Sequence, residues 1–98
     1  MPFDQHIPRP LTPADVRVHT PNAPGVYGIS NAREWLYIGA ADDIQVALLR
    51  HIADLDSSLM RRRPVGFVFE VCDGAHRTAR HHRLILEYEP TLNRRSPD

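Results

Sequence analysis

The sequence predicts one α/β domain of the α+β type, a small three-stranded, mainly antiparallel sheet flanked by helices. Two observations support this prediction. Three short runs are rich in the β-branched and aromatic residues that strands favour, and two longer runs repeat apolar residues every three or four positions. Their order along the chain is strand, strand, helix, strand, helix. The chain has 98 residues, which is enough for one small hydrophobic core.

The first two predicted strands are Val26 to Ile29 and Trp35 to Ile38. Residues 30–34 join them in a loop of hairpin length, so we expect the two strands to be antiparallel neighbours. The third strand is predicted from Val65 to Val71, where apolar residues at every second position indicate one face in the core. These strands account for the whole predicted sheet.

The first predicted helix begins after Asp42 or Asp43, either of which could cap it. Its apolar stripe is formed by Ile44, Leu48, Ile52, Leu55 and Leu59. The second helix is predicted from about Ala75 to Tyr88, and Pro90 ends it because a proline ring disfavours helix in the preceding residue. Both helices are expected to cover the sheet.

The organisation predicted from composition is a proline-rich N-terminal arm at 1–23, a folded domain at 24–93 and a short tail at 94–98. Six of the nine prolines lie in the first 24 residues, which indicates irregular backbone. Leu11 to His19 is the exception: Thr12 is a candidate cap and Pro13 suits the first helical position, so one short turn of helix is expected there. Ile7-Pro8-Arg9-Pro10 is a candidate extended segment for binding a partner protein.

The net charge is zero, so overall charge does not direct the protein towards nucleic acid. All twelve basic residues are arginines, and eight of them follow Arg50. The guanidinium group suits phosphate, although the same residues also fit ordinary solvated helix faces. The candidates for nucleic-acid binding are Arg61, Arg62, Arg63, Arg77, Arg80 and Arg83. No segment resembles a membrane span or a secretion signal, so a cytoplasmic protein is expected.

Two tripeptides, Gly25-Val26-Tyr27 and Tyr37-Ile38-Gly39, lie in the first two predicted strands. Together with Arg50-His51 and the closing segment from Leu84 to Asn93, they resemble the motifs of the GIY-YIG nuclease family in order and spacing. The resemblance covers Pro24 to Asn93. It implies the fold predicted above, and an activity in which DNA is cut with a tyrosine, an arginine and a metal-binding glutamate.

The resemblance assigns a role to each matching position. Tyr27 would be the general base or would orient water, Tyr37 would assist positioning, and His51 matches the family's histidine. The family's arginine falls on Ala47, and Arg50, one helical turn further on, is the candidate substitute. Gly25, Gly39 and Asn93 match structural positions of the motif. Without the resemblance, the tyrosines could equally serve packing and the glycines ordinary strand-end geometry.

The family's glutamate position falls on His81 by two separate counts, three residues before Leu84-Ile85 and twelve before Asn93. Neutral imidazole is a poor ligand for Mg²⁺, which prefers oxygen. The sequence therefore assigns no cofactor. If the protein were active it would need Mg²⁺ or Mn²⁺, with His81 or Glu87 as the candidate ligand.

Three functional hypotheses follow. The first is a DNA-binding protein with a degenerate nuclease site and weak or no phosphodiester cleavage. The second is an active metal-dependent endonuclease with rearranged residues, and the third is a protein-interaction or regulatory domain. Salt-dependent DNA binding without turnover distinguishes the first, metal-dependent nicking the second, and absence of DNA binding the third.

Overall fold

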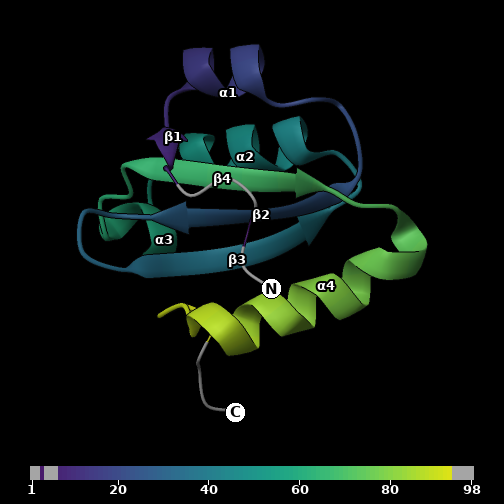
Figure 1. The fold of residues 1–98 in the computed structure, drawn as a ribbon. Helices are drawn as coiled ribbons and strands as arrows, with labels where there is room; N and C mark the ends of the chain where they lie inside the picture. The colour runs from purple at the N-terminus through teal and green to yellow at the C-terminus, as the bar shows by residue number, and fades with distance from the viewer. Residues whose placement is uncertain (1–2, 4–6, 94–98) are drawn as a thin grey trace.

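The computed structural model describes residue 3 and residues 7–93. These form eight elements, which in chain order are β1 (Arg9–Pro10), α1 (Pro13–His19), β2 (Gly25–Ser30), β3 (Trp35–Ala41), α2 (Ile44–Ala53), α3 (Ser58–Arg61), β4 (Gly66–Val71) and α4 (Gly74–Tyr88). The predicted tail at 94–98 lies outside the described residues. In Figure 1, α2 covers one face of the sheet with α1 stacked beyond it, and α4 covers the opposite face.

The sheet has four strands in the order β1-β4-β2-β3, and every neighbouring pair is antiparallel. The prediction of three strands was therefore one short. The missing strand, β1, consists only of Arg9 and Pro10, which pair with Phe67 and Gly66. So short a run has no alternating pattern, and its proline is tolerated because it lies on an edge strand. The segment predicted to bind a partner protein thus contributes to the sheet.

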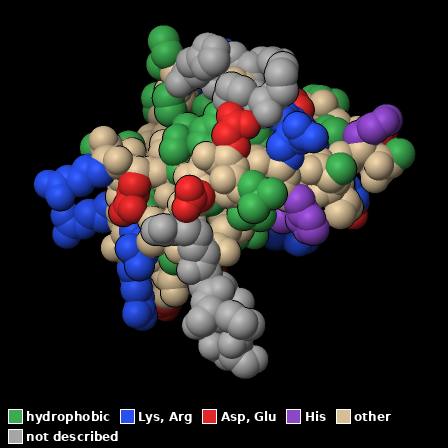
Figure 2. All heavy atoms as spheres, turned by 60° about the horizontal axis from the view of Figure 1, so that its bottom comes forward, with side chains coloured by type: hydrophobic (Ala, Val, Ile, Leu, Met, Phe, Trp, Pro, Cys, Tyr) green, Lys and Arg blue, Asp and Glu red, His purple; other side chains and the backbone are tan. Residues whose placement is uncertain are grey.

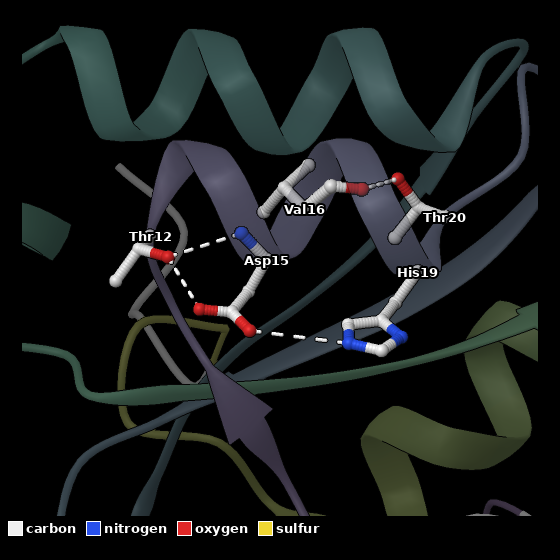
Figure 3. A network of polar contacts seen from close by, with 5 residues as sticks. All are labelled: Thr12, Asp15, Val16, His19 and Thr20. Carbon is white, nitrogen blue, oxygen red and sulfur yellow. Dashed lines mark hydrogen bonds and ion pairs between the residues drawn. The ribbon is translucent and has the colours of Figure 1, made fainter.

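The N-terminal region is more regular than its composition indicated. Thr12 caps α1 as expected: its hydroxyl accepts a hydrogen bond from the Asp15 amide and donates one to the Asp15 carboxylate (Figure 3). At the other end of the helix, the Thr20 hydroxyl donates to the Val16 carbonyl at 2.6 Å. Val16 is fully buried and belongs to the core between α2 and the sheet. The described helix at Pro13–His19 of the predicted arm therefore packs against the core of the domain.

The first predicted helix is divided into α2 and α3. Asp43 caps α2 by accepting from the Val46 amide, as predicted, and α2 ends at Ala53. Leu55, which the stripe placed in the core, is 73% exposed. Asp54 ends the first helix and Ser57 caps the second, so the chain turns between them and Leu59 returns to the core from α3. Asp54 and Ser57 favour helix ends, and they interrupt the helix although the apolar residues keep a helical spacing through this region.

Apolar side chains fill both faces of the sheet. One cluster joins Tyr27, Ile29 and Leu48 to the face covered by α2, and the other joins Val26, Val68 and Leu84 to the face covered by α4. The predicted one-sided pattern for the third strand therefore holds only in part, because Phe67 and its neighbour Val68 are both fully buried. A central strand between two helical layers needs apolar residues on both faces.

The last helix, α4, begins with Asp73, whose carboxylate accepts from the His76 amide. It ends at Tyr88, and Glu89 adopts a left-handed conformation with φ of 47° immediately before Pro90. The sequence prediction of this helix is confirmed to within one residue at its start. None of the helices in the described part of the chain has the length and apolar character needed to cross a bilayer.

Candidate active site

Three aromatic side chains from three elements meet between the sheet and α2. Tyr27 lies on β2, Tyr37 on β3 and His51 on α2. The Tyr27 hydroxyl and the His51 Nε2 are 2.8 Å apart and share a hydrogen bond. The Tyr37 ring centroid lies 6.2 Å from that of Tyr27 and 5.4 Å from that of His51. Tyr27 and Tyr37, which the sequence places on neighbouring strands, therefore lie together at one place.

Gly39 provides the space that the Tyr27 ring occupies. The register of β2 and β3 places Tyr27 directly opposite Gly39. A β-carbon at position 39 would lie 2.5 Å from the Cζ and hydroxyl oxygen of Tyr27, closer than van der Waals contact allows. The glycine of the second tripeptide is therefore required by the tyrosine of the first. This requirement is more specific than ordinary strand-end geometry.

Burial favours the neutral forms of Tyr27 and His51. Tyr27 is only 3% exposed, and burial, together with the neighbouring Tyr37, raises the pKa of its phenol well above the usual value. Burial also lowers the pKa of His51, although the carboxylate of Asp54 acts in the opposite direction. A neutral phenol can donate to an unprotonated Nε2. Activation of Tyr27 as a base would require a nearby positive charge to lower its pKa.

Protonation of His51 should therefore destabilise the fold in mild acid. The unfolded imidazole takes up a proton near pH ~6.5, whereas the folded one has a lowered pKa. Below that pH the unfolded chain binds more protons, so the free energy of unfolding should fall as the pH falls. Urea unfolding at pH 7.5 and 5.0 should show a smaller loss of stability in His51→Gln than in the wild type. The matched change at an exposed position, His82→Gln, should leave the wild-type loss intact, and an equal loss in His51→Gln would contradict this interpretation.

A hollow of about 490 Å³ opens beside the pair, between the end of β3 and α2. Ala47, Arg50 and His51 line it from α2, and Asp42 and Asp43 line it from the loop before that helix. Arg50 is exposed, so its guanidinium is accessible from this hollow. The candidate substitute arginine and the alanine at the expected arginine position thus share one surface.

His81 lies on α4 and contacts β3. Its Nε2 is 3.0 Å from the carbonyl oxygen of Ile38, so that nitrogen carries the hydrogen and donates. Asn93 also binds Ile38 and engages both its backbone groups: its side chain donates to the carbonyl at 3.1 Å and accepts from the amide at 2.7 Å. His81 and Asn93 therefore secure the outer edge of β3 at the centre of the second tripeptide. Residue patterns alone did not predict this clamp by Asn93, and only the family resemblance marked the residue.

The side chains that are candidate metal ligands do not fit a Mg²⁺ ion. At the position expected for the carboxylate, the His81 nitrogen is already a hydrogen-bond donor to a carbonyl. Glu87 is six residues further along the same helix, which places it about 120° away around the axis. Glu70 is bound to Arg80 at 2.7 and 2.8 Å. Nowhere in residues 3 and 7–93 do three or more His, Cys, Asp or Glu side chains gather into a candidate metal site.

The arginines of α4 differ in their surroundings. Arg80 binds Glu70, while Arg77 binds Asp42 at 2.8 Å and the Ala41 carbonyl at 2.7 Å. Arg83 is exposed. Arg77 and Arg80 are therefore committed to contacts within the protein, and they attach α4 to β3 and β4.

A second group of arginines lies at the end of the molecule where the β2–β3 loop meets α3. It consists of Arg33, Arg61, Arg62 and Arg63, and we call it the hairpin-end cluster; all four are exposed. The Asn31 side chain donates to the Arg62 carbonyl at 3.5 Å, which joins the loop to α3. Basic side chains gather at this end in Figure 2, on the left as in Figure 1. Within the described part of the chain, these four guanidinium groups form no ion pair.

The architecture and the Tyr27–Tyr37–His51 arrangement define a class: the chain has the GIY-YIG nuclease fold. It is similar to the N-terminal GIY-YIG endonuclease domain of UvrC from Thermotoga maritima, here a point mutant bound to its catalytic divalent cation. That comparison gives a TM-score of 0.70 and 22% identity over 83% of this chain and 97% of that one. The magnesium-bound form of the same domain gives 0.68 and 22% over 81% and 96%. Neither a protein-family model nor a curated protein sequence matches this chain.

Proposed function

We propose that this chain is a DNA-binding domain that retains the nuclease fold but cleaves phosphodiesters weakly or not at all. The observation that carries the proposal is the position of His81 and the hydrogen bond that its side chain makes. His81 occupies the position where the resemblance expects a metal-binding carboxylate, and it donates a hydrogen bond to the Ile38 carbonyl. A donor in that place supplies no negative charge to hold a divalent cation.

The second missing group is the arginine. Cleavage requires neutralisation of the charge that grows on the phosphoryl oxygens, and loss of one such stabiliser commonly costs about 10² to 10³ in rate. Ala47 stands at the position expected for that arginine. The buried phenol of Tyr27, with its raised pKa, gains no compensating charge from an alanine. Two defects in groups that act together support impaired cleavage, although their costs are not additive.

The hairpin-end cluster supports DNA binding better than the arginines of α4 do. Arg77 and Arg80 are used inside the protein, whereas Arg61, Arg62 and Arg63 are exposed beside Arg33. Exposed guanidinium groups without internal carboxylate partners can neutralise phosphates and release counterions. The similar UvrC domain is itself named an endonuclease domain, which agrees with a nucleic-acid ligand.

Binding should weaken steeply with salt. For four phosphate contacts to duplex DNA, the logarithm of affinity should fall against the logarithm of salt concentration with a slope of about −3 to −4. Fluorescence anisotropy between 50 and 200 mM salt measures this slope. The double variant Arg61→Ala and Arg62→Ala should reduce it by about two, because two contacts are lost.

Arg17→Ala is the matched control, since Arg17 is exposed on α1, which packs against α2. It should change the slope little. Absence of binding at 50 mM salt by folded protein would overturn the proposed function. An equal effect of Arg17→Ala would show non-specific attraction instead of a defined surface.

A further inference from the structure

His51 also lines a second hollow. Its volume is about 510 Å³, within the range of small-molecule sites. The residues that matter for its chemistry are Tyr37, Asp54, Ser57, Leu59 and Leu92, from β3, the α2–α3 turn, α3 and the segment after α4. Tyr37 and His51 of the candidate active site take part in its lining, but no ligand has been assigned to this hollow above.

The lining suits a flat ring with polar edges. The Tyr37 ring and the apolar side chains of Leu59 and Leu92 offer packing surfaces, and Tyr37 is only partly buried. Asp54 supplies a carboxylate and Ser57 a hydroxyl. A carboxylate repels phosphate but accepts hydrogen bonds from the N–H groups of a nucleobase, so the charge in the hollow favours a base. Aromatic surfaces bind bases by stacking.

Two of the lining residues, Ser57 and Thr91, connect the hollow to the hairpin-end cluster. Along α3, the Arg61 amide donates to the Ser57 carbonyl at 3.1 Å, so Arg61 is one helical turn from the lining. The hydroxyl of Thr91, which also lines the hollow, donates to the Glu34 carboxylate at 2.6 Å, and Arg33 precedes that glutamate. A nucleotide with its base in the hollow would therefore have its phosphates beside arginines.

We propose that this hollow binds one unpaired nucleobase, with the adjoining phosphates held by the hairpin-end cluster, so that single-stranded nucleic acid is the preferred ligand. This inference rests on the proposed function and specifies its substrate class. Bases in a duplex are stacked and paired, and they enter a pocket only after being flipped out at a cost in free energy. Single strands avoid that cost.

The test compares a 12-nucleotide single-stranded DNA with the corresponding duplex by anisotropy at one salt concentration. Ser58→Trp would fill the hollow, because Ser58 lines it and is exposed at the start of α3. We expect this variant to bind the single strand about tenfold more weakly, the effect of losing one stacked base, and the duplex as before. Thr78→Trp places the same side chain at an exposed position on α4 and should change neither affinity.

Tyr37→Phe and Tyr37→Leu provide a second measurement. Phenylalanine keeps a stacking face and should preserve the preference for single strands, whereas leucine should reduce it, with circular dichroism confirming that both variants fold. Equal affinity of the wild type for the two ligands would overturn this inference, as would an unchanged preference in Ser58→Trp. Either result leaves DNA binding intact. Failure to bind both ligands would instead overturn the proposed function itself.

Discussion

Gly25→Ala is expected to destabilise the domain severely. A β-carbon at this position would collide with the backbone carbonyl oxygen of Glu70 on β4 and would lie 2.6 Å from the Cδ1 of Ile44 on α2. A backbone carbonyl in a central strand cannot rotate away as a side chain can. Overpacking typically costs about 1–3 kcal/mol, and we expect this substitution at or above the upper end.

Gly39→Ala should have a related effect with a functional consequence. The added β-carbon would displace the Tyr27 ring, whose atoms lie 2.5 Å away. That displacement should lengthen or break the 2.8 Å contact with His51. The substitution should therefore change the titration of His51, measured by NMR. It should also lower the urea concentration at the midpoint of unfolding.

Gly74→Ala is the matched control for both glycine substitutions. A β-carbon there meets no atom within 4 Å, and the residue is the first of α4. Alanine favours helix over glycine by up to about 1 kcal/mol, so this variant should be as stable as the wild type or slightly more so. Equal urea midpoints for Gly25→Ala and Gly74→Ala would contradict the close packing of β2, β4 and α2.

The sequence predicted the parts of the fold that local patterns determine. The Asp43 cap and the start of α4 depend on residues within one helical turn of each other. The tripeptides placed Tyr27 and Tyr37 on adjacent strands. By contrast, β1 has two residues and exists only because β4 offers an edge. No local pattern encodes such a pairing.

Site features that depend on distant contacts were harder to predict. Helical spacing put Arg77 and Arg80 on one edge of α4, but it could not reveal that Asp42 and Glu70 bind them. Arg33 did not enter the predicted arginine set, because no local pattern reveals that the Asn31 side chain contacts the Arg62 carbonyl and so joins the hairpin loop to α3. The clamp of Asn93 on Ile38 likewise joins residues 55 positions apart.

Restoring both missing groups is expected to produce the largest change in activity. In the double variant A47R/H81E, the arginine would enter the 490 Å³ hollow that Ala47 lines, and the glutamate would replace a hydrogen-bond donor with a carboxylate. Each restored group is of the kind that contributes about 10² to 10³ in rate. We therefore expect nicking of supercoiled DNA with Mg²⁺ to rise by at least about a hundredfold, and Tyr27→Phe in the same background to abolish the gain.

The most direct test of the central claim is a nicking assay on supercoiled DNA with Mg²⁺ or Mn²⁺, comparing wild type, Tyr27→Phe and A47R/H81E, each shown by urea unfolding to be folded. Impaired cleavage predicts that the wild type and Tyr27→Phe give the same background rate, while the double variant nicks. Metal-dependent nicking by the wild type that disappears in Tyr27→Phe would contradict it. The protein would then be an active nuclease with a different arginine and metal ligand.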